Sequence, residues 1–283
     1  PAGAIVGRVL DKNGVPVIRA WVTAVVLKWP PRVRGLSGSQ YGGADEQGRF
    51  SIGALPLGGE DLVVAHEENR VVASAPIVLD EVNPTAEIEL RLLAGEALQG
   101  QLLGLDGKPV EGARVTLTYD TDHGWSSSAA FVLTGPQGWF VFEGFNPDVP
   151  GHYELAIKPL RDYRPIYVGK IRTDGEPLLY KLARGMTARG VVVEDSSGHP
   201  IPGADVQAEA LRPPRGGISR FAAEGRTNER GEFRFSNLAP GRYRILFHAG
   251  SVPETIIQAG REEPVEVRVK LAEWSSLSPR KPE

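Results

Sequence analysis

The sequence predicts an all-β protein made of tandem antiparallel β-sandwiches, and three observations support this. Apolar and charged residues alternate over short runs, as in residues 232–236, where Phe233 and Phe235 stand between Glu, Arg and Ser. The 34 glycines and 23 prolines are spread along the chain, which is typical of many turns. The same order of strands and turns also recurs three times. The alternation of apolar and charged residues indicates sheets with one buried face and one face exposed to solvent.

The clearest copy of the pattern lies in the last third of the chain. Residues 198–206 are expected to run from a loop into a strand. A tight hairpin turn follows, because Asn228 can bond to its own backbone and Gly231 can take a positive φ. A Pro-Gly corner then leads to a strand beginning near Tyr243. The spacing of Gly and Pro leaves no apolar stripe at helical period, which excludes an amphipathic helix.

The earlier copies predict strands in the same order. In the first copy they are expected at residues 5–10, 20–26, 50–52, 61–66, 71–79 and 86–92. In the second copy they are expected at 98–100, 113–115, 140–142 and 178–182. The third copy opens with a strand at 187–192 and closes with one near 265–271.

The copies keep one period, which indicates tandem duplication of complete domains. Two sets of glycines are spaced by 90 to 93 residues: Gly7, Gly100 and Gly190, and Gly48, Gly138 and Gly231. We therefore expect three β-sandwich repeats at residues 1–93, 94–183 and 184–273, with a linker or tail at 274–283.

Composition narrows the function classes. The chain is 41% hydrophobic and 24% charged with a net charge of −3, which argues against nucleic-acid binding. It has no cysteine, so disulfides, thiolate zinc sites and cysteine nucleophiles are excluded. No segment is predicted to span a membrane, and no leader is present. Because the chain starts at Pro1 without Met, we expect a fragment from which a leader or anchor has been removed.

The motif order of the third copy resembles that of the carboxypeptidase regulatory-like domain. The matching residues are Gly190, Asp195, Gly198, Pro200, Gly203, Ala204, Val206, Thr227, Asn228, Gly231, Phe233, Phe235, Pro240, Gly241 and Tyr243. The other copies depart from it: Ala44 replaces the usual Thr, Gly135 replaces Asn, and residues 56–59 replace the Pro-Gly-x-Tyr corner.

This resemblance implies three tandem seven-stranded Greek-key sandwiches of transthyretin-like (prealbumin-like) type. Collagen-binding B-type repeats and the starch-binding-like, carbohydrate-binding-like fold are related to that family. The family is functionally loose, so the resemblance does not imply one activity. Its metallocarboxypeptidases hold their zinc in a separate catalytic domain, which this chain lacks.

The sequence offers little catalytic chemistry. Asp120 and residues 121–123 include metal-ligand types, but we interpret this stretch as a solvated loop tip. The five histidines are scattered singly, and the serines at 126–128 have no paired base. We therefore expect no enzyme activity, no cofactor and no metal.

Long excursions after the second strand of each copy are the candidate binding surface. Pro-Pro-Arg recurs in the first and third, and stiff loops carrying aromatics beside Arg can stack on sugars or seat a protein. The candidate residues are Trp29, Arg32, Tyr41, Trp125, Arg215 and Phe221. The alternative is that these aromatics fold back over the ends of the sandwiches.

These observations favour a non-catalytic exported array that is a spacer, display or protein-interaction module of a larger bacterial protein. The alternatives are a carbohydrate- or cell-wall-polymer-binding module and accessory domains of a larger peptidase or other secreted enzyme. The expected partner is another protein or a cell-surface polysaccharide, and not a nucleic acid. We expect a monomer located outside the cell, at the cell surface or in the periplasm.

Overall fold

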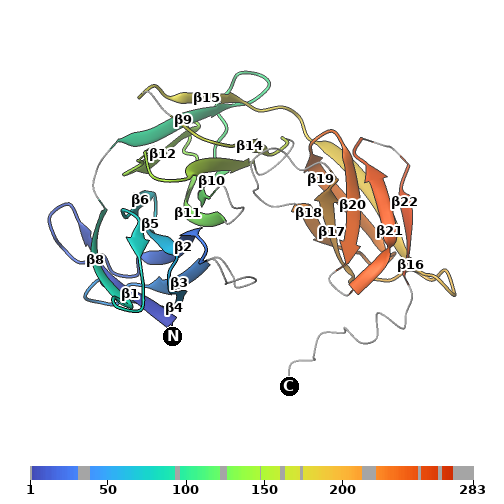
Figure 1. The fold of residues 1–283 in the computed structure, drawn as a ribbon. Coiled ribbons are helices and arrows are strands. Elements are labelled where there is room, and N and C mark those ends of the chain that lie inside the picture. Colours follow the sequence, from blue (N-terminus) through green and yellow to red (C-terminus); the bar gives the residue numbers. More distant parts are fainter. Residues whose placement is uncertain are drawn as a thin grey trace. The chain divides into compact units, whose positions relative to one another are not determined.

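The computed structural model describes residues 2–30, 39–92, 96–121, 126–146, 148–159, 163–172, 175–211, 221–247, 250–260 and 263–269. Every regular element within these ranges is a strand, which confirms the all-β prediction (Figure 1). The chain forms two compact units. The first holds Pro1–Lys158 and Ile166–Leu182, and the second holds Ala183–Pro214 and Ser219–Glu283.

The first copy of the sequence pattern forms two layers of strands. Its strands are β1 (Ala2–Asp11), β2 (Trp21–Lys28), β3 (Ser39–Gly43), β4 (Arg49–Pro56), β5 (Glu60–Glu67), β6 (Arg70–Ala73), β7 (Ile77–Val78) and β8 (Thr85–Leu92). One layer has the order β4-β1-β8, and the other contains β3, β2, β5, β6 and β7. The predicted strand at 71–79 is divided into β6 and β7. Pro76 has no N–H for the ladder, and the Ser74 Oγ instead accepts a hydrogen bond from the Val63 N–H at 3.0 Å.

The second copy repeats this order. Its strands are β9 (Ala97–Leu103), β10 (Arg114–Asp120), β11 (Ser126–Leu133), β12 (Trp139–Glu143), β13 (His152–Lys158), β14 (Ile166–Val168) and β15 (Leu178–Lys181). One sheet has the order β11-β10-β13-β14. Strands β9, β12 and β15 join the first copy's strands in a larger sheet, because Glu143 of β12 pairs in parallel with Arg70 of β6. The first two copies therefore share a sheet within one compact unit.

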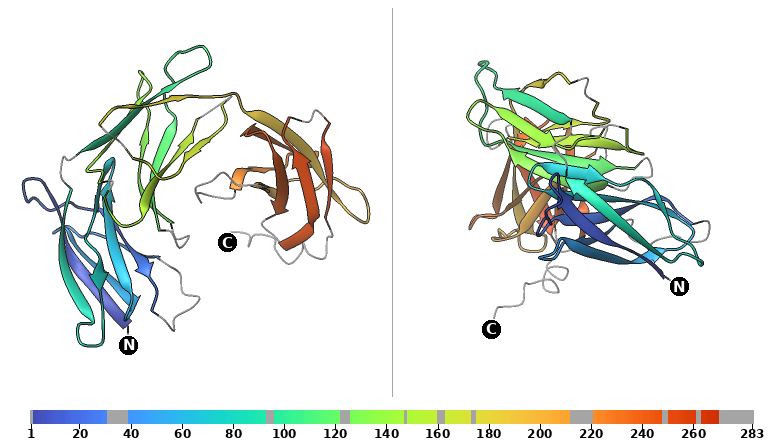
Figure 2. Two further views of the ribbon diagram at one scale, coloured as in Figure 1. Left: turned by 45° about the horizontal axis from the view of Figure 1, so that its top comes forward. Right: turned by 90° about the vertical axis from the view of Figure 1, so that its left-hand side faces the viewer.

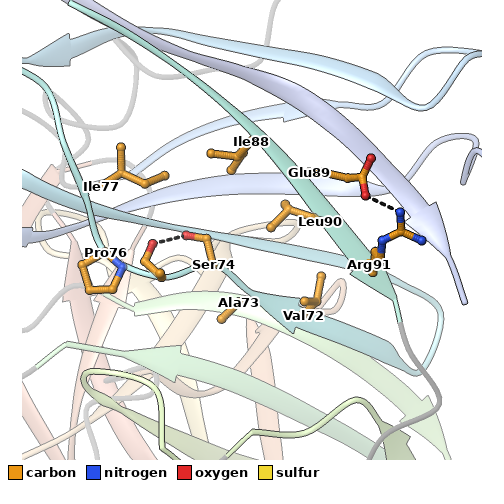
Figure 3. Close-up of a pocket in the computed structure, with 10 residues that line it drawn as sticks. Val72, Ala73, Ser74, Pro76, Ile77, Ile88, Glu89, Leu90 and Arg91 are labelled. Carbon is orange, nitrogen blue, oxygen red and sulfur yellow. Dashed lines mark hydrogen bonds and ion pairs between the residues drawn. The ribbon is translucent and has the colours of Figure 1, made fainter. Parts of the chain in front are cut away.

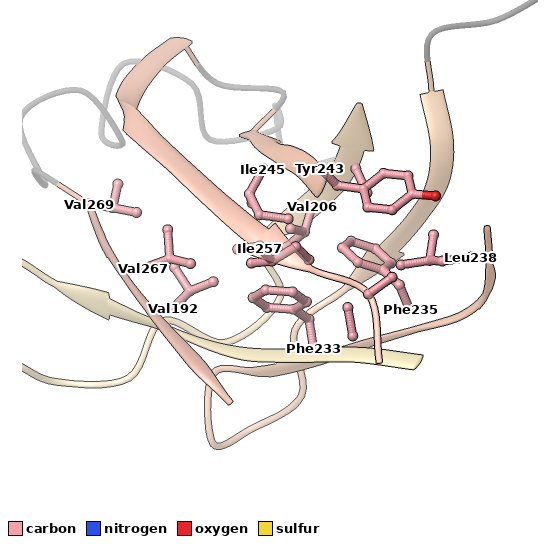
Figure 4. Packing of buried hydrophobic residues seen from close by; sticks show 14 of the residues in the cluster. Val192, Val206, Phe233, Phe235, Leu238, Tyr243, Ile245, Ile257, Val267 and Val269 are labelled. Atoms are coloured by element: carbon pink, nitrogen blue, oxygen red, sulfur yellow. The ribbon is translucent and has the colours of Figure 1, made fainter. Parts of the chain in front are cut away.

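The third copy lies in the second unit. Its strands are β16 (Met186–Glu194), β17 (Asp205–Ala210), β18 (Phe221–Arg226), β19 (Glu232–Leu238), β20 (Arg242–Phe247), β21 (Gly250–Gln258) and β22 (Val265–Val269). They form two sheets, β19-β16-β22 and β18-β17-β20-β21, drawn as two layers in Figure 2. The core between the layers combines Phe233 and Phe235 of one sheet with Val206, Tyr243 and Ile245 of the other (Figure 4).

The excursions expected as loops each contain a strand. These are β3, β11 and β18, which pair antiparallel with β2, β10 and β17 respectively. The Ser-Ser-Ser-Ala-Ala run at 126–130 has no apolar alternation, so the sequence does not reveal β11. The strand exists because pairing with β10 satisfies its backbone groups.

The periodic glycines allow a close approach of ring and backbone in all three copies. A Cβ built on Gly100 would lie 2.6 Å from the Phe140 ring and 2.6 Å from the Leu178 carbonyl oxygen. The same two neighbours recur around the other two glycines: the Phe50 ring and Ile88 carbonyl at Gly7, and the Phe233 ring and Val265 carbonyl at Gly190. Phe140 and Phe233 are buried, as predicted.

The predicted hairpin turn of the third copy is confirmed. The Asn228 Oδ1 accepts hydrogen bonds from the Arg230 and Glu232 N–H groups, both at 2.9 Å. Gly231 has a φ of 70°, and a Cβ there would lie 2.6 Å from the Val192 carbonyl oxygen. Glycine is therefore required both for its φ and for its small size.

Candidate functional site

The structure describes only part of the predicted binding surface. Arg32, Trp125 and Arg215 lie outside the described residues. Phe221 opens β18 opposite Glu209, but its side chain also lies outside the described part. Trp29 is half-buried just after β2, and Tyr41 is 69% exposed in β3. Tyr41 is thus the predicted site residue that the described structure places plainly on the surface.

Tyr41 forms an exposed aromatic pair with Trp21, which sequence reasoning did not select. Their rings stack with centroids 5.3 Å apart and planes inclined by 16°. Tyr41 pairs with Thr23 of β2, and Gly43 pairs with Trp21, so the two aromatics are diagonal neighbours on one face. Trp21 is 45% exposed although it precedes the buried Val22. That alternation was the available signal, because neighbouring strand residues point to opposite faces.

The second copy has a related stacked contact, between Arg114 and Phe131, at the equivalent position of the repeat. Val22 and Val115 are equivalent in the repeat, so Arg114 corresponds to Trp21. The Arg114 Cζ lies 4.1 Å from the centroid of the Phe131 ring. Phe131 pairs with Thr116 in the register that Tyr41 adopts with Thr23, and its ring is exposed.

The third copy replaces this planar contact by an ion pair. Arg226 binds Asp205 through two hydrogen bonds of 2.8 and 3.1 Å, and both side chains are exposed. Exposed stacks and ion pairs contribute only about 1 kcal/mol each to stability. The fold therefore does not need the Trp21–Tyr41 and Arg114–Phe131 contacts for its own stability.

A group of side chains of metal-ligand type lies at one end of the sheet β11-β10-β13-β14. Asp120, His152 and Glu154 each offer a ligand-type atom, and these atoms lie within 4.8 Å of one another. Asp120 pairs with His152 across β10 and β13, and Glu154 lies two residues further along β13. Asp120 is only 7% exposed, so the expectation of a solvated loop tip is wrong for this residue. The register between β10 and β13 buries Asp120. The sequence around residue 120 does not predict this burial.

Gly151 makes this juxtaposition possible. Its φ is 92°, and a Cβ there would lie 2.6 Å from the Asp120 carbonyl oxygen and 2.7 Å from the Tyr119 hydroxyl oxygen. The chain can therefore enter β13 directly beside the end of β10, which brings His152 opposite Asp120.

Burial also perturbs the carboxyl groups of the first unit. Burial, together with the neighbouring Asp120 carboxylate, raises the pKa of Glu154, and a hydrogen bond with His152 opposes that rise. The His152 Nε2 lies 3.3 Å from the Glu154 Oε1. Burial alone raises the pKa of Asp61 in β5 to about 6.

An open pocket of about 520 Å³ lies between β6, β7 and β8 of the first copy (Figure 3). Its walls are mainly apolar, with Val72, Ile77, Ile88 and Leu90 among the lining residues. Its polar groups are paired with one another: the Ser74 hydroxyl donates to the Ala75 carbonyl at 2.7 Å, and Glu89 pairs with Arg91 (Figure 3). The described polar side chains of this pocket therefore already have partners within the protein.

Comparison with solved structures finds several proteins at low identity. The Bacillus anthracis TIE protein is 16% identical with a TM-score of 0.24, over 95% of this chain and 50% of that one. The Streptococcal ancillary pilin is 12% identical with a TM-score of 0.27, over 95% of this chain and 98% of that one. BcpA, the major pilin subunit of Bacillus cereus, is 10% identical with a TM-score of 0.23, over 95% and 99%. The chain thus spans half the length of the first of these.

No curated protein matches the chain in a sequence comparison. Among the described residues, no helix is long and apolar enough to cross a membrane. The family model of the carboxypeptidase regulatory-like domain matches residues 187–272. The third copy of the repeat is therefore similar to carboxypeptidase regulatory-like domains, as its motif order predicts.

Proposed function

We propose that this chain is a non-catalytic β-sandwich module of an exported bacterial protein, and that it contacts another protein through the Trp21–Tyr41 pair. The observation that supports this proposal is the stacking of these two rings on the outer face of β2 and β3. Trp21 is 45% exposed there and Tyr41 is 69% exposed. Two large aromatics on a surface are unfavourable in water unless a partner covers them.

The geometry of the pair suits recognition. Tyr and Trp supply large contact areas at low cost in conformational entropy, and both dominate the binding energy of protein interfaces. Strands β2 and β3 are paired over residues 21–25 and 39–43, so the platform is held by a backbone ladder and not by a loop. A site on such a scaffold loses little freedom on binding.

In this proposal the three copies are β-sandwich repeats with the boundaries predicted above, and they hold the platform away from an anchoring surface. The chain is monomeric and lies outside the cell, at the cell surface or in the periplasm. The match of residues 187–272 to a regulatory-like domain supports a non-catalytic role for that segment.

A second candidate function is binding of a carbohydrate or cell-wall polymer to the same platform. The observation in its favour is the near-parallel stack, which presents aromatic surface to solvent as a flat element. Sugar rings stack on aromatic faces through their apolar C–H groups.

The two candidates are separated by parallel binding assays. Wild type and the variants Trp21→Ala and Tyr41→Ala are tested against a glycan array and a panel of extracellular proteins from the source organism. Val82→Ala, which alters an exposed residue distant in sequence from the pair, is the control. Protein capture lost in both aromatic variants supports the first candidate, and glycan capture lost in both supports the second. Binding that survives both substitutions, or is absent from wild type, contradicts a role for the platform.

A further inference from the structure

The cluster of Asp120, His152 and Glu154 is separate from the aromatic platform and has a chemistry of its own. It combines one imidazole with two carboxylates, and one ligand-type atom from each lies within 4.8 Å of the others. A metal ion at the centre of such a group would reach all three at the usual bond lengths of about 2.0–2.2 Å with small side-chain adjustments.

Glu154 supplies an independent sign that something is bound here. It is 1% exposed, and its Oε2 is shielded from water yet accepts no hydrogen bond from the residues that the structure describes. A buried carboxylate oxygen without a partner is costly, and proteins normally pair such a group or use it to coordinate a metal. The other oxygen, Oε1, already lies 3.3 Å from His152 Nε2, so the Glu154 side chain is directed into the cluster.

The electrostatics of the cluster favour a cation. A carboxylate oxygen of Asp120 and one of Glu154 lie within 4.8 Å of one another, so two negative charges would repel one another there. Among the described residues, no lysine or arginine forms an ion pair with Glu154, which instead lies beside the His152 imidazole. A divalent cation would neutralise both carboxylates at once.

We propose that Asp120, His152 and Glu154 bind a divalent transition-metal ion, and that Zn²⁺ is the ion whose preferences they match. Zn²⁺ accepts mixed nitrogen and oxygen donors in a four-coordinate arrangement, with water in the remaining position. Ca²⁺ requires about six to eight oxygen ligands, which three side chains including an imidazole do not provide.

The backbone presents the ligands on a rigid frame. Asp120 and His152 form a cross-strand pair between β10 and β13, and Glu154 lies on the same face of β13 because it is two residues away. His152 is the most accessible of the three and offers the route by which the ion enters. A bound ion would clamp the ends of β10 and β13 together and would stabilise the folded state by mass action.

The test is zinc titration of the metal-free full chain by isothermal calorimetry with ZnCl₂. One Zn²⁺ per chain is expected, with a melting temperature that rises on zinc addition and falls again with EDTA. His152→Ala and Glu154→Gln should each weaken binding by more than about 100-fold, the upper end of the loss caused by removing a metal's outer-shell partner. His199→Ala removes an exposed histidine from a turn outside the cluster and should bind zinc like wild type.

Two further measurements keep the result decisive. If His152→Ala fails to fold by far-ultraviolet circular dichroism, Glu154→Gln and Asp120→Asn, which keep the side-chain shapes, decide the outcome. CaCl₂ should bind more weakly than ZnCl₂. The proposal is overturned if wild type binds no zinc at millimolar concentration, if Ca²⁺ binds more tightly, or if the folded variants bind zinc as wild type does.

Discussion

Asp61 occupies in the first copy the core position that Tyr243 occupies in the third. Asp61 lies two residues before Val63, which pairs with Ala24. Tyr243 lies two residues before Ile245, which pairs with Ala208, the residue of the third copy equivalent to Ala24. The Tyr243 hydroxyl donates to the Ala239 carbonyl at 2.7 Å, which ties the strand to its corner. Asp61 is 1% exposed, and within the described part of the chain neither of its carboxyl oxygens accepts a hydrogen bond. The first copy therefore buries a carboxyl group at the position where the third copy buries a hydrogen-bonded tyrosine.

Asp61 should make the stability of the first unit depend on pH. Burial raises its pKa to about 6, above the ordinary value of 3.8, so the folded state holds the proton more tightly than the unfolded state. Protonated Asp61 therefore makes its full contribution to the stability of the folded state below about pH 4, and this contribution is lost as the pH rises through about 6. Asp61→Asn should be more stable than wild type at pH 7 by up to about 3 kcal/mol, and equally stable at pH 4.

Urea unfolding of both proteins from pH 4 to pH 8 measures this difference. Asp195→Asn, which changes an exposed aspartate, is the control and should follow wild type throughout. A difference between wild type and Asp61→Asn that does not change with pH would show that Asp61 does not titrate in this range.

The hydroxyl of Thr227 should stabilise the third copy. Its Oγ1 accepts a hydrogen bond from the Ala204 N–H and donates one to the Ile201 carbonyl, both at 2.8 Å. Thr227→Val keeps the shape but leaves these two buried groups without a side-chain partner, and should cost about 1–3 kcal/mol. Thr227→Ser keeps the hydroxyl and should recover most of this loss. Thermal unfolding compares the three proteins, and equal stability of the Val and Ser variants would refute a role for the hydroxyl.

Truncation of a core phenylalanine should act within its own unit. Phe233 packs against Phe235 with ring centroids 5.2 Å apart, and both are buried (Figure 4). Phe233→Ala should lower the unfolding free energy of the second unit by about 3–5 kcal/mol, because it removes a buried ring and leaves a cavity. Hydrogen exchange should then accelerate in β17 and β20 and stay unchanged in β2 and β5. Equal acceleration in all four strands would contradict independent unfolding.

The Trp21–Tyr41 pair should contribute little to stability. Tyr41 is largely exposed, so Tyr41→Ala should lower the unfolding free energy by about 1 kcal/mol or less. Tyr243→Ala is the matched comparison, because that tyrosine is buried and hydrogen-bonded, and it should cost about 3–5 kcal/mol. Denaturant unfolding measures both variants. A loss of several kcal/mol in Tyr41→Ala would mean that the ring supports the fold, and would weaken its assignment to binding.

The sequence by itself determined the strand class, the turns and the repeat. These features depend on local rules: alternation selects strands such as β19, positive φ selects Gly231, and the Phe ring beside Gly190 leaves no room for a side chain. The match of residues 187–272 to a known domain follows from the same motif order.

Only the tertiary structure decided which side chains meet. Trp21 and Tyr41 are neighbours because of the register between β2 and β3, and Asp120 meets His152 because of the register between β10 and β13. Asp61 replaces the tyrosine of the third copy at a corner whose own sequence, Pro56 to Gly59, hides the equivalence. Register depends on packing between segments far apart in the chain, so no local pattern encodes it. The two candidate sites are products of that register, which is why the sequence supplied their residue types without showing that they come together.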